Sequence, residues 1–177
     1  MKTRTILAAI VCSFIPFVQA AAGDGINNSP IKVNNIGKYM GRWYEIARFD
    51  HRFEKGQTNT SAFYSQNTDG TIKVANTGWK NGKLKTSNGK AKLTNTAGLL
   101  RVSFFWPFYS DYRILMLADD YSHALVGGSS DDYLWILART PQINNSTKKT
   151  ILKEAERRGY NTSRLIWVDQ NKNNSIL

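Results

Sequence analysis

Side chains that could perform acid–base or metal chemistry are sparse in this sequence. The two histidines, His51 and His123, are far apart in the chain and belong to no metal-spaced pair. No Gly-x-Ser-x-Gly elbow, P-loop or Gly-x-Gly-x-x-Gly run is present. Glu45 could be a buried acid of raised pKa beside Trp43, or could simply pair with Arg48 or solvent. These residues disfavour catalysis, and we expect no metal and no cofactor.

The first twenty residues carry a targeting pattern. Lys2 and Arg4 precede an apolar run over 6–18, and Val18-Gln19-Ala20 supplies the small residues that a signal peptidase requires. The run is shorter than the ~20 residues of a membrane-spanning helix, so we expect a signal peptide over 1–20. Cys12, the only cysteine, could carry a lipid anchor, but such an anchor requires a small residue before the cysteine. Val11 is a poor fit to that position. We therefore expect an exported protein of the periplasm or cell envelope, free or associated with the outer membrane, without that anchor.

Composition and charge narrow the class of protein. The chain has 177 residues, 41% of them hydrophobic and 12% aromatic, and this balance indicates one globular domain. Its formal charge of +11 falls to +9 when the signal peptide is removed. Such a charge favours nucleic acid, anionic membranes or acidic ligands as partners. We expect no nucleic acid partner, because the aromatic residues alternate with polar ones as a buried face requires and the chain is exported.

A period-two alternation of apolar and polar residues dominates the rest of the chain and indicates strands. The expected strands are Trp43–Phe49, Thr60–Gln66, Thr71–Gly78, Gly89–Asn95, Leu99–Trp106, Asp111–Ala118, Ser122–Gly127 and Tyr133–Arg139. Turn signals separate them at Asp69-Gly70, Asn81-Gly82, Asn88-Gly89 and Gly127-Gly128. Eight short strands without intervening helices predict an all-β fold, an antiparallel up-and-down barrel.

The C-terminal part departs from this alternation. Asn145-Ser146 offers a helix cap, Ile151, Leu152 and Ala155 share a face, and Gly159 stands where a helix would stop. We expect one helix there, followed by a short ninth strand over 164–168. The domain organisation is then a signal peptide (1–20), a polar leader (21–36), the barrel domain (37–170) and a flexible tail (171–177).

The interior of an eight-stranded barrel is either filled by side chains or open to one small apolar ligand. Alternation predicts an apolar inward set that would contact such a ligand: Tyr64, Val74, Val102, Phe104, Ile114, Met116, Tyr133 and Trp135. Small residues at other expected inward positions would leave space: Ala62, Gly78, Gly89 and Ala91. Periodicity alone does not choose between this open barrel and an ordinary packed core.

Several motifs resemble those of the lipocalin family, and of its bacterial branch in particular. The run Gly41-Arg42-Trp43-Tyr44-Glu45-Ile46-Ala47-Arg48 resembles the glycine-x-tryptophan motif, and its continuation over 49–54 resembles bacterial members. Asp119-Asp120-Tyr121 resembles the second motif with its threonine replaced, and Trp135-Ile136-Leu137-Ala138-Arg139 the third. The resemblance covers nearly the whole mature chain.

The resemblance implies a structural role for one set of residues. Trp43 would plug the closed end of the barrel, and Arg139 would pack across its indole, a contact worth ~0.5–2 kcal/mol. The other residues implied in barrel closure are Gly41, Asp120 and Tyr121.

The resemblance also implies a ligand class. The expected cargo is a fatty acid or lysophospholipid, held for lipid storage or transport in the bacterial envelope by a monomer or weak homodimer. The alternatives are an isomerase-like lipocalin enzyme and a scavenger of small hydrophobic ligands.

One basic cluster bears on where the ligand head group would lie. It comprises Lys73, Lys80, Lys83, Lys85, Lys90 and Lys92, in a stretch over 70–98 that contains no acidic residue. One explanation of this cluster is a solvated surface that keeps the strand edges soluble. A positive rim at the open end, or attraction to an anionic membrane surface, explains it in another.

Overall fold

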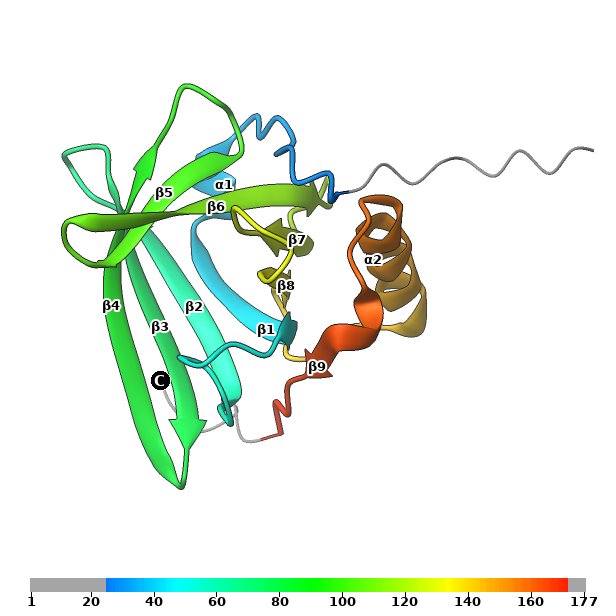
Figure 1. Ribbon diagram of the computed structural model, residues 1–177. Helices are drawn as coiled ribbons and strands as arrows, with labels where there is room; N and C mark the ends of the chain where they lie inside the picture. Colours follow the sequence, from blue (N-terminus) through cyan, green and yellow to red (C-terminus); the bar gives the residue numbers. More distant parts are fainter. Residues whose placement is uncertain (1–24, 172–177) are drawn as a thin grey trace, which may run out of the picture.

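The computed structural model describes residues 25–171, which form a closed antiparallel barrel with one helix against its outer wall (Figure 1). The strands are β1 (Gly41–Phe49), β2 (Thr58–Gln66), β3 (Ile72–Lys80), β4 (Lys83–Leu93), β5 (Leu99–Phe105), β6 (Phe108–Leu117), β7 (His123–Gly127), β8 (Leu134–Ala138) and β9 (Leu165–Trp167). The helices are α1 (Ile36–Tyr39), α2 (Asn145–Arg157) and the 3-10 turn η1 (Thr162–Arg164). No helix in this described part is long and apolar enough to cross a membrane.

The barrel closes through β1. Strands β2 to β8 pair in sequence order, β8 pairs with β1, and the first half of β1 returns to β2, with Trp43 opposite Ala62. The second half of β1 pairs instead with β9, where Phe49 lies opposite Leu165. The predicted eight-stranded up-and-down barrel with a C-terminal helix and a short ninth strand is confirmed.

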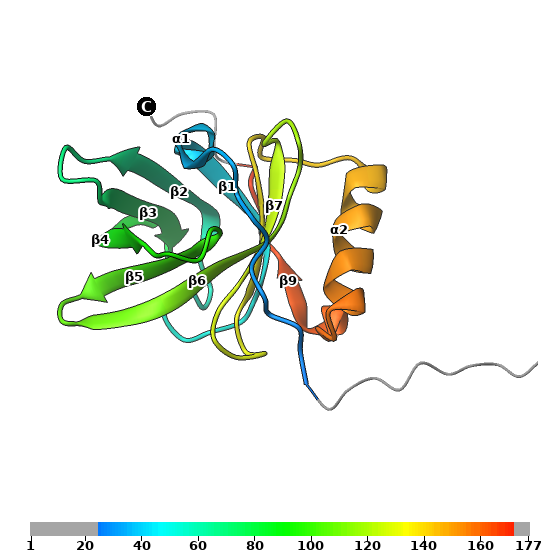
Figure 2. The same ribbon diagram turned by 90° about the horizontal axis from the view of Figure 1, so that it is seen from above.

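Two hydrophobic clusters lie on opposite faces of the barrel wall. We call the barrel interior the lumen. The inner cluster, built around Trp43, fills its lower part. The outer cluster lies between the wall and α2, where Ile151 and Ala155 are fully buried. Figure 2 shows α2 on one side of the barrel, far from β3 and β4. The helix therefore supports one wall and leaves the lumen free.

Helix α2 begins and ends close to its predicted limits. The cap is Asn144, whose side chain accepts from the amide of Thr147 at 2.8 Å, so the predicted Asn145-Ser146 cap is one residue late. Gly159 follows the C-cap with φ +88°, a conformation that favours glycine. The neighbouring Arg158 donates to the carbonyl of Leu115 at 2.6 Å and joins the helix to β6.

Three of the four predicted turn signals lie at connections, Gly127-Gly128 between β7 and β8 among them, and one is wrong. Asp69-Gly70 and Asn81-Gly82 connect β2 to β3 and β3 to β4, whereas Asn88 and Gly89 lie inside β4, opposite Ala75 and Val74. The ladder continues through them because β3 offers a partner at every position. Strand β4 is consequently longer than predicted and begins at Lys83. Helix α1, which Asn35 caps, was not predicted.

Strand direction defines the two ends of the barrel. Because consecutive strands alternate in direction, the connections β1–β2 (50–57), β3–β4 (81–82), β5–β6 (106–107) and β7–β8 (128–133) lie at one end, which we call the mouth. Trp43, near the start of β1, lies toward the opposite end, the floor, where its ring packs against Tyr39 of α1. Figure 1 shows α1 beside the start of β1.

Candidate ligand site in the barrel

At the floor, an arginine is stacked on a tryptophan. The guanidinium carbon of Arg139 lies 3.9 Å from the ring centroid of Trp43. Two nitrogens of the Arg139 guanidinium donate to the carbonyls of Arg42 and Lys38, each at 2.7 Å. The indole Nε1 of Trp43 donates to the carbonyl of Tyr39 at 2.7 Å. These bonds satisfy the polar atoms of both side chains within the protein, and the role of the pair in closing the floor stays a prediction.

The other predicted closure residues surround this pair. Gly41 has φ +92°, and a Cβ atom there would lie 3.5 Å from Nη1 of Arg139. The carbonyl of Tyr121, whose φ is +60°, accepts from Nε of Arg139 at 3.3 Å. The carboxylate of Asp120 accepts from the amide of Ser122 at 2.9 Å and fixes that turn.

Three tyrosine hydroxyls meet above the floor. The hydroxyl of Tyr112 lies 2.7 Å from that of Tyr39 and 3.1 Å from that of Tyr64. Burial raises the pKa of all three, that of Tyr64 to about 12, so each stays protonated at neutral pH. The sequence analysis named Tyr64 alone. Tyr112 could also have been predicted to face inward, because it lies two residues before Ile114 on the same strand and therefore on the same face.

Most of the predicted inward residues line the lumen. Tyr64, Val74 and Ile114 are buried in the inner cluster, and Val102 and Trp135 pack against it. Phe104 also faces inward, because an ideal Cβ on the inward Gly89 would lie 2.8 Å from its ring. Tyr133 is stacked on Trp135 with ring centroids 6.0 Å apart. Their role as ligand contacts stays a prediction.

The prediction that Met116 faces inward is wrong. A register shift between Ile114 and Met116 interrupts the alternation of β6. Ile114 pairs with the inward Val126, whereas Met116 pairs with Leu125, which belongs to the outer cluster. Met116 therefore packs on the helix side of the wall.

Small inward residues do not leave the empty space that we expected. A Cβ on Gly78 would lie 2.3 Å from Oε1 of Gln57 and 2.7 Å from Cγ2 of Thr60. The space beside Gly89 is taken by the ring of Phe104. These glycines are therefore required for close packing of neighbouring side chains.

Solvent reaches several side chains of the inner wall nearer the mouth. Phe104 faces inward but is 37% exposed. Val102, Tyr133 and Trp135 are half-buried, although alternation places them on the inner wall. The inner wall between the tyrosine hydroxyls and the mouth is therefore accessible to solvent.

A buried polar cluster lies between the lumen and the β1–β2 connection. Arg48, 2% exposed, donates to the carboxylate of Glu45 at 2.7 Å and to the carbonyls of Glu54 and Gln57 at 2.8 and 3.2 Å. Burial raises the pKa of Glu45, and Arg48 opposes that rise. Both readings of Glu45 in the sequence hold: it is a buried acid, and Arg48 is its partner.

Glu54 connects the mouth to the lumen wall. Its Oε2 accepts from the indole Nε1 of Trp135 at 3.1 Å. Burial, with a smaller contribution from Glu45, raises the pKa of Glu54 to about 8. The Nε2 atom of His51 also lies 3.1 Å from Glu54, but burial lowers the pKa of His51 to about 4. His51 is consequently neutral at pH 7, and this contact is not an ion pair.

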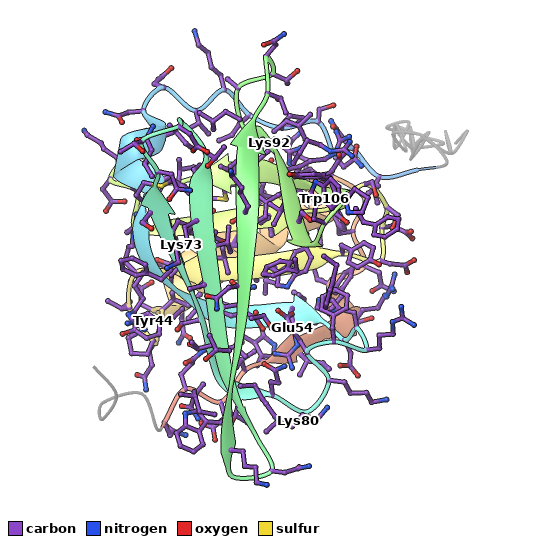
Figure 3. The ribbon with its side chains drawn as sticks, turned by 90° about the vertical axis from the view of Figure 1, so that its left-hand side faces the viewer. Tyr44, Glu54, Lys73, Lys80, Lys92 and Trp106 are labelled. Carbon is purple, nitrogen blue, oxygen red and sulfur yellow. The ribbon has the colours of Figure 1, made fainter. Side chains whose placement is uncertain are left out.

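The basic cluster divides into two groups. Lys80, Lys83 and Lys85 come at the mouth end of β3 and β4, where register with the inward Gly78 places them on the inner face. Lys73 and Lys90 face outward from the barrel wall. Figure 3 shows Lys92 near the end of the β3–β4 pair opposite to Lys80. Three of the six lysines therefore belong to the mouth.

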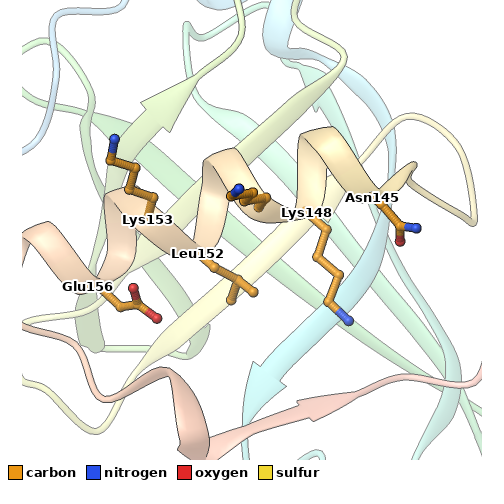
Figure 4. A pocket seen from close by; sticks show the side chains of 6 residues that line it. Asn145, Lys148, Leu152, Lys153 and Glu156 are labelled. Atoms are coloured by element: carbon orange, nitrogen blue, oxygen red, sulfur yellow. The ribbon is translucent and has the colours of Figure 1, made fainter.

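A depression of about 430 Å³ lies outside the barrel, along α2 (Figure 4). Its lining consists of Asn145, Lys148, Lys149, Leu152, Lys153 and Glu156. It contains one apolar side chain and no residue predicted to bind ligand, so we assign it no role. Residues 25–171 contain no group of three histidine, cysteine or acidic side chains that could hold a metal.

A closed eight-stranded barrel with an apolar and aromatic inner wall that solvent reaches near the mouth is typical of proteins that take one small hydrophobic ligand. A family model described as a lipocalin-like domain matches residues 33–170. The chain belongs to the lipocalin family, whose members bind small hydrophobic ligands.

Individual relatives support this assignment. The chain is 43% identical over 176 residues to the outer membrane lipoprotein Blc of Escherichia coli K12, covering 96% of this chain and 98% of that protein. It is 42% identical over 146 residues to temperature-induced lipocalin-1 of Arabidopsis thaliana, covering 76% and 78%. Among solved structures, insecticyanin from the tobacco hornworm Manduca sexta matches with a TM-score of 0.69 at 18% identity, covering 81% and 85%.

Proposed function

We propose that the lumen holds the acyl chain of a fatty acid or lysophospholipid, for storage or transport of lipids in the bacterial envelope. The observation that carries this proposal is the inward but solvent-accessible wall around Phe104 and Trp135. Each methylene buried there contributes ~0.8 kcal/mol, so a long chain offsets the cost of association. Binding is reversible and involves no chemical step.

The head group would lie at the mouth. Lys80, Lys83 and Lys85 lie there on the inner face, and Lys83 and Lys85 are exposed. A carboxylate or phosphate near them keeps its hydration and gains attraction from the cations. The lower lumen, with its protonated tyrosine hydroxyls, offers no charged partner to an anion.

Titration of lysophospholipid and fatty acid tests the proposal with a matched pair of variants. Phe104→Ser removes an inward ring that is 37% exposed, and Phe63→Ser removes an outward ring that is 46% exposed. We expect saturable binding of one lipid per chain, about tenfold weaker or more in Phe104→Ser and unchanged in Phe63→Ser. Native mass spectrometry gives the stoichiometry and detects copurified lipid. Absence of binding, or equal losses in both variants, contradicts the proposal.

The location of the protein in the envelope is a further part of the proposal. Relatives named outer membrane lipoproteins favour the envelope, and they reopen the question of an anchor at Cys12. Cys12 lies outside the described residues. The intact mass of the processed protein decides: cleavage after Ala20 gives an unmodified chain, whereas an anchor gives an acylated chain that begins at Cys12.

A further inference from the structure

The tip of the β5–β6 hairpin exposes three large aromatic side chains. Phe105, Trp106 and Phe108 are 81%, 83% and 77% exposed. Within residues 25–171, none of the three belongs to either hydrophobic cluster. Contiguous exposed rings of this size cost solubility and contribute nothing to the core, so a contact with a partner is the function they fit.

This tip belongs to the mouth end of the barrel, and other connections at that end also expose apolar side chains. Phe53 of the β1–β2 connection is 59% exposed, and Leu84 at the start of β4 is 45% exposed. The β1–β2, β3–β4 and β5–β6 connections lie at this end by strand direction, and Figure 3 shows Trp106 well apart from Lys80 around the barrel. The rim of the lumen is therefore apolar at several points of its circumference.

The same rim is cationic. Segments 50–57, 80–85 and 105–108 contain five cations, Arg52, Lys55, Lys80, Lys83 and Lys85, against the two carboxyl groups of Asp50 and Glu54. Of these two, Glu54 is mostly protonated at neutral pH because burial raises its pKa to about 8. The acids of the fourth connection, Asp131 and Asp132, lie 3.9 and 3.0 Å from Arg164.

We propose that the mouth of the barrel docks on the head-group region of an anionic lipid bilayer, with Phe105, Trp106 and Phe108 inserted. Tryptophan and phenylalanine with flanking lysines are the residues that anchor proteins at membrane interfaces. A second copy of the chain fits less well, because it would bring the same cations against each other. If the proposed function holds, docking in this orientation places the lumen next to the lipids it takes up.

Flotation of the purified protein with vesicles tests the proposal. The vesicles contain phosphatidylethanolamine with phosphatidylglycerol, or phosphatidylcholine alone. We expect binding to the anionic vesicles that weakens with salt and falls about tenfold or more when Phe105, Trp106 and Phe108 are changed to Ser. A matched variant, Phe63→Ser with Leu93→Ser, removes exposed apolar side chains elsewhere and should bind like the wild type.

A charge-matched pair locates the electrostatic part of the surface. Lys83→Glu with Lys85→Glu reverses charge at the mouth, and Lys149→Glu with Lys153→Glu reverses the same charge on α2, at the side of the barrel (Figure 2). We expect the first to lose vesicle binding by about tenfold and the second to change it by about twofold or less. Any contribution of the N-terminus is the same in all variants.

Three outcomes overturn the proposal: equal binding by the aromatic variant and the wild type, equal loss in the two lysine variants, or sedimentation as a dimer that only the aromatic variant dissociates, without vesicle binding. Titration with monomeric lipid in the absence of vesicles is independent of docking. The aromatic variant should retain that binding. If wild type binds vesicles but no monomeric lipid, the proposed function fails and the docking surface stands.

Discussion

The indole Nε1 of Trp135 donates to the carboxyl group of Glu54 at 3.1 Å, and this bond joins the inner wall of the barrel to the connection at its mouth. Arg48 holds the same connection through the carbonyls of Glu54 and Gln57. The part of the lumen that we propose for the ligand is thus bordered by a buried, titratable group. Its protonation affects stability.

The free energy of unfolding should fall as the pH rises from about 6.5 to 8.5, because Glu54 has a pKa of about 8 when folded and an ordinary value of 4.5. The folded state then holds a proton that the unfolded state lacks, and this stabilisation is lost as the pH passes the folded pKa. We expect a loss of about 2 kcal/mol in the wild type. His51, whose pKa falls to about 4, acts with the opposite sign and only below about pH 6.5.

Glu54→Gln is the control for this pH dependence, because an amide oxygen still accepts from Trp135 and does not titrate. Urea unfolding at both pH values checks the prediction. Equal losses of stability in the variant and the wild type would show that another group is responsible.

Arg139→Lys should destabilise the protein by about 2–4 kcal/mol, although it conserves the charge. A lysine lacks the planar face that lies over Trp43 and cannot replace the donors to Lys38 and Arg42 together. Arg101→Lys alters an exposed pair with Asp111 and should cost less than about 1 kcal/mol. Denaturant midpoints at constant m-value give both quantities, and similar costs at the two sites would argue against the floor as described.

Gly89→Ala should cost about 1–3 kcal/mol, since the new Cβ would lie 2.8 Å from the ring of Phe104 and from the carbonyl oxygen of Ser103. The carbonyl of Ser103 is held in the strand ladder and moves little. The ring of Phe104 must therefore shift to make room for the new carbon. Lipid affinity should therefore change together with stability. Gly25→Ala has no atom within 4 Å of the added carbon and should be neutral in both measurements. An equally neutral Gly89→Ala would mean that the inner wall yields easily.

Alternation along strands predicted the barrel because a strand in a closed barrel has one buried side. The method works for Val74, Val102 and Trp135, which follow unbroken ladders. It fails for Met116, because the shift beside Ile114 reverses the faces of β6 and leaves no mark in the residue types. A similar shift in β1, between Glu45 and Ala47, lies within the segment that carries the Glu45–Arg48 pair.

Other features depended on contacts between distant segments. Glycines at 78 and 89 suggested empty space, but side chains from neighbouring segments fill it. The lysine cluster looked continuous in sequence, and the pairing of β3 with β4 divides it between the mouth and the outer wall. The aromatic residues around Trp106 read as an ordinary strand, and only the position of the hairpin tip shows that they are exposed.

Quenching of Trp135 by a brominated fatty acid tests the central claim most directly, because bromine quenches an indole only on close approach. Trp135 lies on the inner wall and Trp79 on the outer face of β3. The account predicts saturable quenching at one lipid per chain that is mostly lost in Trp135→Phe and retained in Trp79→Phe. Quenching that survives in Trp135→Phe, or that never saturates, would contradict binding of an acyl chain in the lumen.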